Sequence, residues 1–78
     1  MYYVYILRGK NGKIYIGLTR DLVKRVKVHN TGKVKSTKKL RPLKVIYYEA
    51  FETSKLARRE ELFLKSGKGR ERLKYLIE

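Results

Sequence analysis

The residues best suited to chemistry are two tyrosines, an arginine, the single histidine and a glutamate. Tyr5 and Tyr15 lie in two short aromatic segments on either side of a turn-forming stretch. Arg25 and His29 follow in a basic segment, four residues apart, so both project from the same side of a helix. Phenols, a guanidinium and an imidazole can together orient water, move protons and hold a phosphate. The pattern suggests a phosphate-cutting site rather than a generic basic surface.

Glu60 is the carboxylate that the apolar pattern places on a buried helix face. It lies in the middle of a stripe with apolar residues three and four positions away on both sides. A buried glutamate needs a cation or a metal ion, because an unpaired buried charge is strongly destabilising. Its partner is either Arg25 or a lysine in an internal salt bridge, or a metal. Glu61, four residues before Lys65, is expected to form an ordinary surface pair. The stripe consists of Leu56, Ala57, Phe63 and Leu64.

Two strands and a tight turn are expected to position the tyrosines. Residues 2–7 and 14–18 are rich in aromatic and β-branched side chains, which favour strands. The turn between them admits two registers. A two-residue turn pairs Lys10 with Lys13, whereas a three-residue loop that ends in a left-handed glycine pairs Gly9 with Lys13.

Side-chain segregation favours the three-residue loop. In that register one face of the hairpin is aliphatic and the other carries the tyrosines, whereas the alternative splits the apolar residues across both faces. The longer loop also sets Tyr5 opposite Gly17, which leaves open space beside the phenol. The two faces are Val4, Ile6, Ile14, Ile16 and Leu18 on one side, and Tyr3, Tyr5, Tyr15 and Gly17 on the other.

The first helix is expected to carry Arg25 and His29. Thr19 or Asp21 can cap its start, and it runs to about Asn30 with Gly32 as its stop. A basic loop over residues 33–41 follows this helix.

The rest of the chain predicts a third strand and two more helices. The strand covers residues 43–50, the second helix begins at Thr53 or Ser54 and ends near residues 66–67, and a short final helix has an apolar face. The order β-β-α-β-α-α predicts an α+β fold with about three helices packed on a three-stranded antiparallel sheet. Residues 1–78 form one domain in this interpretation. The final apolar face consists of Leu73, Leu76 and Ile77.

The charge points to an anionic partner. The 78 residues include 21 Lys and Arg against 7 Asp and Glu, a net charge of +14. Nucleic acid is the leading partner, with DNA expected and RNA as the alternative, and affinity should fall steeply with salt. We expect no membrane association, because no apolar run approaches the roughly 18 residues of a span. The candidate nucleic-acid-binding residues are Arg25, Lys33, Lys35, Thr37, Lys38, Lys39 and Arg41.

Cysteine and histidine usage limits the metal chemistry. The chain has no cysteine and one histidine, which excludes disulfides and argues against a zinc site. Any metal would therefore be a hard ion held by oxygen. The N-terminal segment has the pattern of a strand rather than a signal peptide, so we expect a cytoplasmic protein.

Several motifs in order resemble the GIY-YIG nuclease family. Tyr3-Val4-Tyr5 resembles the first strand motif with tyrosine in place of glycine, and Tyr15-Ile16-Gly17 matches the second. Residues 21–30 match the family helix of the form Asp-Leu-x-x-Arg-x-x-x-His-Asn. The small stand-alone members of the family share three further motifs, which here are Gly32-Lys33, Arg41-Pro42-Leu43 and Arg58-Arg59-Glu60.

The resemblance implies a metal-dependent DNA endonuclease, structure-selective or nonspecific, that acts in DNA repair or recombination. It assigns Mg²⁺ or Mn²⁺ to Glu60, the phosphate to Arg25 and the attacking water to Tyr5. Tyr15 and His29 support the water and phosphate by hydrogen bonds, and His29 can also relay protons. Some characterised nucleases of the family carry a late asparagine near the site, and this sequence has none after Asn30. The larger members attach separate DNA-binding domains, which we do not expect in a chain of 78 residues.

Two other functions are compatible with the sequence. A non-catalytic module would hold DNA or RNA through residues 33–41 and the first helix, by phosphate contacts that do not read bases. A scaffold that docks on an acidic protein is the weaker alternative. Cleavage assays separate the nuclease from the binding module, and salt-dependent nucleic-acid binding separates both from the scaffold.

Overall fold

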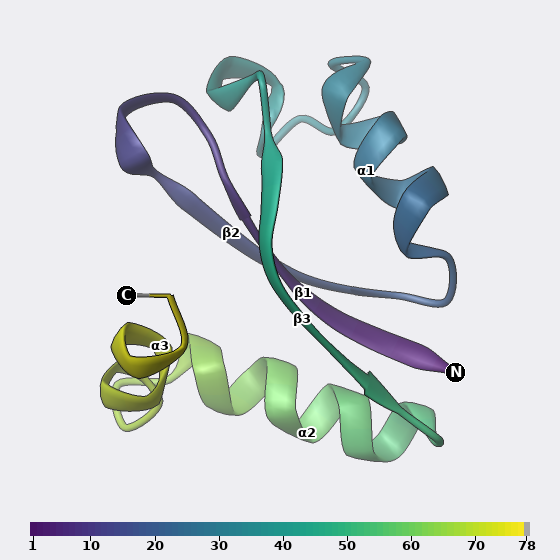
Figure 1. The fold of residues 1–78 in the computed structure, drawn as a ribbon, viewed down its shortest axis with the longest axis vertical. Coiled ribbons are helices and arrows are strands. Elements are labelled where there is room, and N and C mark those ends of the chain that lie inside the picture. Colours follow the sequence, from purple (N-terminus) through teal and green to yellow (C-terminus); the bar gives the residue numbers. More distant parts are fainter. Residues whose placement is uncertain (78) are drawn as a thin grey trace.

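A three-stranded antiparallel sheet forms the centre of the molecule. In the computed structural model, which describes residues 1–77, the strands are β1 (Tyr2–Arg8), β2 (Ile14–Thr19) and β3 (Lys44–Phe51). Their order in the sheet is β2-β1-β3, so β1 pairs on both sides (Figure 1). Its residues 4–7 are buried as a result, and Tyr5 lies at the centre of the fold.

The hairpin between β1 and β2 has the register of the three-residue loop. Tyr5 is opposite Gly17, and the backbone N–H of Gly9 donates to the carbonyl of Lys13 at 2.8 Å. Gly12 is left-handed with φ 72°, as predicted. Asn11 also has a positive φ of 62°, and residues 10–12 form a short 3₁₀ turn that was not predicted. Asparagine is among the residues that tolerate this conformation.

Three helices complete the predicted order. They are α1 (Leu22–Asn30), α2 (Ser54–Lys65) and α3 (Arg70–Ile77). The sequence β-β-α-β-α-α and the α+β class are therefore confirmed. A single 3₁₀ turn, η2 (Lys38–Leu40), interrupts the basic loop and was not predicted. None of the helices in residues 1–77 is long and apolar enough to cross a membrane.

The structure shows which of the two cap residues predicted for each of α1 and α2 is the actual cap. The carboxylate of Asp21 accepts from the backbone N–H of Lys24 at 3.1 Å, so Asp21 rather than Thr19 is the cap of α1. The hydroxyl of Thr53 accepts from the N–H of Leu56 at 3.2 Å and caps α2. These bonds satisfy amide groups that a helix start leaves without partners.

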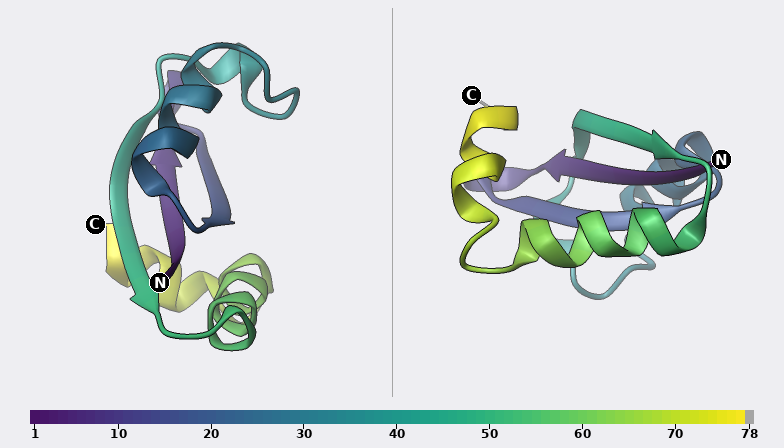
Figure 2. Two further views of the ribbon diagram at one scale, coloured as in Figure 1. Left: turned by 90° about the vertical axis from the view of Figure 1, so that its right-hand side faces the viewer. Right: turned by 90° about the horizontal axis from the view of Figure 1, so that it is seen from below.

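The two faces of the sheet are covered by different helices. Figures 1 and 2 show α1 against one face and α2 with α3 against the other. The α2 and α3 face buries the larger apolar cluster, whereas the α1 face buries Tyr5, Leu7 and Leu43. The predicted separation of aliphatic and tyrosine faces is confirmed. The buried residues of the larger cluster are Val4, Ile6, Ile16, Ala57 and Leu64.

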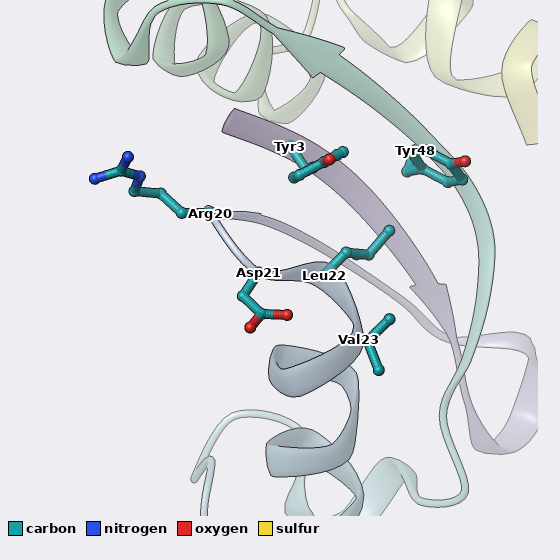
Figure 3. Close-up of a pocket in the computed structure, with 6 residues that line it drawn as sticks. All are labelled: Tyr3, Arg20, Asp21, Leu22, Val23 and Tyr48. Carbon is teal, nitrogen blue, oxygen red and sulfur yellow. The ribbon is translucent and has the colours of Figure 1, made fainter. Parts of the chain in front are cut away.

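An open groove lies where α1 begins, between that helix and the strands β1 and β3 (Figure 3). Its volume is about 510 Å³, and the rings of Tyr3 and Tyr48 approach edge to face with centroids 6.1 Å apart. None of the predicted catalytic side chains lines this groove. The groove consists of Tyr3, Arg20, Asp21, Leu22, Val23 and Tyr48.

Candidate active site

A buried chain of hydrogen bonds links β1, α1 and the basic loop. The hydroxyl of Tyr5 lies 2.8 Å from Nε2 of His29, and Nδ1 of His29 lies 2.8 Å from Oγ1 of Thr37. Tyr5 is 1% exposed, and His29 and Thr37 are fully buried. Buried polar groups of this kind are stable only when they are hydrogen-bonded to one another.

The loop that carries Thr37 is fixed at both ends by Asn30. Its side-chain amide donates to the carbonyl of Leu43 at 2.9 Å, and its carbonyl oxygen accepts from the N–H of Leu43 at 2.7 Å. These two bonds join the end of α1 to the start of β3. Residues 31–42 must therefore close as a loop over the buried histidine, which brings Thr37 to His29.

The two predicted catalytic tyrosines and the histidine lie together. The ring centroid of Tyr15 is 6.2 Å from that of Tyr5 and 4.9 Å from that of His29. Gly17 permits this arrangement, because a β-carbon there would overlap the hydroxyl of Tyr5. The space beside the glycine is thus filled by the phenol itself, where the sequence had suggested an open pocket.

Burial, and after it the charge of Arg25, determine the electrostatics of this group. Burial raises the pKa of Tyr5, and the neighbouring Arg25 guanidinium opposes that shift, while Tyr15 and Glu61 reinforce it. Burial lowers the pKa of His29, and the charge of Arg25 lowers it further. At neutral pH the phenol is therefore protonated and the imidazole is neutral. Within residues 1–77, no carboxylate lies within 4 Å of the Arg25 guanidinium, which leaves its charge open to an anion.

The prediction for Glu60 requires correction. Its carboxylate accepts two hydrogen bonds from Arg72 of α3, at 2.9 and 3.1 Å, and also influences the pKa values of Tyr47 and Glu49. This group lies on the α2 and α3 side of the sheet, and Glu60 is the only predicted catalytic residue that takes part in these described contacts. Glu60 does have a cationic partner, as expected, but the partner is Arg72 rather than Arg25 or a lysine.

Glu61 occupies the inward position that the sequence assigned to Glu60. Its side chain is buried, at 7% exposure, and lies close enough to Tyr5 to raise the pKa of the phenol. Oε2 pairs with the ammonium of Lys65 at 2.9 Å, so the predicted partner is present but the predicted surface position is wrong. Its other oxygen, Oε1, is buried with no hydrogen-bond partner among the described residues.

The error came from the choice of helix stripe. The buried residues of α2 are Ala57, Glu61 and Leu64, spaced by four and three, whereas Leu56 and Phe63 are about 40% exposed. The true stripe is centred one residue later, a rotation of about 100° around the helix axis. The spacing of Ala57 and Leu64 around Glu61 was a signal in the sequence, but two large exposed apolar residues outweighed it.

The basic loop is exposed except at Thr37. The cationic residues predicted to bind nucleic acid keep exposed side chains, and Nε of Arg41 donates to the carbonyl of Lys38 at 2.8 Å. Thr37 is fully buried against His29, so the prediction that it contacts nucleic acid is corrected. The exposed cations are Lys33, Lys35, Lys38, Lys39 and Arg41.

The carboxylate chemistry fits a hard divalent ion. No group of three histidine or acidic side chains arranged to hold a metal occurs in residues 1–77. Mg²⁺ needs few protein ligands, because it retains several waters and uses one or two carboxylates together with substrate phosphates. The buried Oε1 of Glu61, which has no hydrogen-bond partner among the described residues, offers one such oxygen on a carboxylate whose charge raises the pKa of Tyr5.

Comparisons with known proteins identify the family. The chain matches the GIY-YIG catalytic domain over residues 1–74. A UPF0213 protein of Staphylococcus saprophyticus is 36% identical over 78 residues, covering 99% of this chain and 95% of the relative. A UPF0213 protein of Clostridium perfringens is 42% identical over 66 residues, covering 83% of this chain and 71% of the relative.

A solved structure agrees with the fold. The UPF0213 protein BH0048 from Bacillus halodurans, determined by solution NMR, is 38% identical to this chain. The two structures superimpose with a TM-score of 0.59 over 97% of this chain and 85% of that protein. The GIY-YIG match suggests nuclease activity, a DNA substrate and dependence on a divalent metal. Since the match covers nearly the whole sequence, this chain belongs to the GIY-YIG family.

Proposed function

We propose that this protein is a divalent-metal-dependent endonuclease that hydrolyses phosphodiester bonds in DNA, with Glu61 as its essential carboxylate. The observation that supports this most directly is the buried Oε1 of Glu61, which has no hydrogen-bond partner among the described residues, on a carboxylate whose charge also raises the pKa of Tyr5. A stable fold rarely leaves a carboxylate oxygen buried without a partner, unless a ligand or ion completes the site. The family pattern placed this role on Glu60, one residue earlier.

Each of the other gathered side chains has a role in that reaction. Arg25, with no described carboxylate within 4 Å, holds the phosphate and stabilises the charge that develops on it. Tyr5 orients the attacking water and moves its proton, and His29 is the hydrogen-bond partner of that phenol. Tyr15 packs against His29 and limits where the water and phosphate can lie.

Glu61 would hold the metal, Mg²⁺ or Mn²⁺. A divalent ion at this carboxylate supplies positive charge that polarises the phosphate and stabilises the leaving oxygen. Lys65 now pairs with Oε2 of Glu61 at 2.9 Å, so this ammonium adds positive charge at the same carboxylate.

The binding surface supports a substrate selected by shape or charge rather than by base sequence. The exposed cations of residues 33–41 and the net charge of +14 favour contacts with phosphates. We propose branched, damaged or nonspecific DNA as the substrate and repair or recombination as the setting. Binding should weaken steeply as salt rises.

The two neighbouring glutamates provide a matched test. Supercoiled plasmid is incubated with Mg²⁺ and wild type, Glu61→Gln or Glu60→Gln, and the nicked form is quantified over time. We expect Glu61→Gln to lose about 100-fold or more of the nicking rate, and Glu60→Gln to stay close to wild type. Both variants should bind DNA, because the cationic loop is unchanged.

Three outcomes would contradict the assignment. They are loss of nicking in Glu60→Gln alone, equal activity in both variants, and nicking by wild type that persists in excess EDTA. If wild type binds DNA but cleaves no duplex, junction or single-stranded substrate with Mg²⁺ or Mn²⁺, the chain is a binding module instead.

A further inference from the structure

Thr37 differs from every other polar residue of the basic loop. It is fully buried, whereas its neighbours Ser36 and Lys38 are exposed. Its hydroxyl lies 2.8 Å from Nδ1 of His29 and 3.4 Å from the carbonyl oxygen of Val34. A threonine buried in so polar a loop needs a reason, because its hydroxyl loses its water partners on burial.

We propose that Thr37 is a positioning residue that holds His29 as the Nδ1–H tautomer, so that Nε2 accepts the phenol proton of Tyr5. This inference rests on the proposed nuclease function and extends it to Thr37, to which no catalytic role was assigned above. Thr37 touches neither substrate nor metal in this scheme; it acts through His29.

The available hydrogen-bond donors and acceptors favour the Nδ1–H tautomer of His29. The Tyr5 hydroxyl interacts with two side chains in the described residues, Nε2 of His29 at 2.8 Å and the guanidinium of Arg25, and of these only Nε2 can accept a proton. If Nε2 carried the proton, the phenol hydrogen would be buried without an acceptor, since nearby Arg25 can only donate. With the proton on Nδ1, the Thr37 oxygen accepts it and the Thr37 hydrogen points to the Val34 carbonyl.

This tautomer gives Tyr5 a base for its proton. As the water attacks phosphorus, its O–H bond breaks and the proton moves to the phenol oxygen, while the phenol proton moves to Nε2 of His29. The new P–O bond forms and the bond from phosphorus to the leaving oxygen breaks; its electron pair stays on that oxygen, which takes up a proton from solvent. His29 becomes a cation, which returns its extra proton to solvent after the reaction. That cation donates from Nε2 to Tyr5 and from Nδ1 to Thr37, so both of its N–H groups keep partners.

Tyr5 and His29 are both neutral before the reaction because of their burial and of the groups that face them. Arg25 of α1 and Tyr15 of β2 face His29, and Arg25, Tyr15 and Glu61 of α2 face Tyr5. Burial is the main cause that lowers the pKa of His29 and raises that of Tyr5; Arg25 adds to the first shift and opposes the second. The Nε2 lone pair is therefore available at neutral pH, and the phenol still holds its proton.

The single histidine allows a direct measurement. The chain contains one histidine, so ¹⁵N NMR of uniformly labelled protein reports the two ring nitrogens of His29 without overlap. We expect wild type to show a protonated Nδ1 and an unprotonated Nε2 near neutral pH. Thr37→Val, which keeps the shape but removes the acceptor, should move population toward the Nε2–H tautomer. Thr37→Ser keeps the hydroxyl and should retain the wild-type tautomer.

Kinetics then test whether the tautomer matters. With Mg²⁺ and plasmid DNA, we expect Thr37→Val to lower kcat roughly tenfold with KM unchanged, and Thr37→Ser to restore most of the rate. The low-pH limb of the kcat profile should shift in Thr37→Val and not in Thr37→Ser. A purely structural role would lower the amount of folded protein without moving that limb.

Several results would overturn the inference. A wild-type His29 protonated on Nε2 would do so alone, whatever the variants show or whether they fold. An unchanged tautomer in folded Thr37→Val would also do so, as would equal kcat values in all three proteins. If wild type cleaves nothing, the nuclease proposal fails while the NMR result still decides the tautomer, so the two failures are distinct.

Discussion

The two faces of the sheet are buried by different kinds of interaction. The face under α2 and α3 is aliphatic, and its buried cluster includes Val4, Ile6 and Leu64. The face under α1 buries the phenol of Tyr5 together with a histidine and a threonine. Hydrophobic burial needs no directional match, whereas buried polar groups must find partners. The first face therefore stabilises the fold, and the second fixes the geometry of the site.

Helix α2 packs on the aliphatic face but also carries the carboxylate proposed for the site. Ala57 and Leu64 pack into the aliphatic cluster, while Glu61 between them affects the pKa of Tyr5 on the other side of the sheet. The neighbouring Glu60 turns away to Arg72. One position along this helix, a rotation of about 100°, thus separates the carboxylate proposed for the site from one in a surface ion cluster. This difference between the two faces leads to four predictions.

The largest expected effect is on the aliphatic face. Leu64 is 1% exposed in the centre of the larger cluster, and Leu64→Ala should lower the free energy of unfolding by about 2–5 kcal/mol. Leu62, on the same helix but 52% exposed, is the matched control, and Leu62→Ala should change stability by less than about 0.5 kcal/mol. Urea denaturation followed by circular dichroism measures both. Equal losses in the two variants would show that α2 does not pack as described.

The second prediction concerns the tyrosine face. In Gly17→Ala the new methyl group overlaps the hydroxyl of Tyr5, and the central strand gives that ring little room to move. We expect the free energy of unfolding to fall by about 1–3 kcal/mol. Nicking should also be lost, because the displaced Tyr5 no longer forms its hydrogen bond with His29. Gly67, where an added methyl group would meet no other atom within 4 Å, is the control, and Gly67→Ala should keep both stability and activity. Wild-type nicking by folded Gly17→Ala would argue against Tyr5 as the residue that handles the water.

Much of this arrangement was predictable from the sequence because it depends on local rules. The hairpin register followed from the alternation of aliphatic and aromatic residues, and the cap of α1 was one of two candidates. Tyr5, Tyr15, Arg25 and His29 were found because strand alternation and helix spacing place them on one face. The resemblance to the family added the chemistry.

The remaining features depend on tertiary contacts that no short pattern carries. The choice between Glu60 and Glu61 depends on which side of α2 meets the sheet, and exposed Leu56 and Phe63 made the wrong side look apolar. Thr37 looked like part of a solvated loop, because its bond to His29 spans eight residues and needs the loop to close. A sequence pattern does not show that closure.

The third prediction is a pH dependence that originates on the tyrosine face. Burial holds the pKa of His29 below its ordinary value of 6.5, so the unfolded chain takes up this proton first as the pH falls. The free energy of unfolding should therefore decrease as pH drops below 6.5, by at most about 1.4 kcal/mol per pH unit from this one group. In His29→Asn the slope should be smaller over the same range, and the difference in slopes isolates His29 from the carboxylates. Parallel pH curves for the two proteins would contradict a buried neutral imidazole.

The smallest effect is expected at the surface ion cluster of the aliphatic face. Arg72 lies between Glu60 at 2.9 Å and Glu49 at 3.8 Å, and its side chain is 41% exposed. Because water and salt screen such pairs, Arg72→Ala should cost only about 0–1 kcal/mol, and the loss should shrink in about 1 M salt. The control is Arg70→Ala in the same helix, since no described carboxylate lies within 4 Å of Arg70. Both variants should nick DNA at similar rates, because this cluster lies away from Tyr5 and His29. A selective loss of nicking in Arg72→Ala would indicate that Glu60 and Arg72 take part in the active site. It would contradict the proposal that only the tyrosine face carries the chemistry.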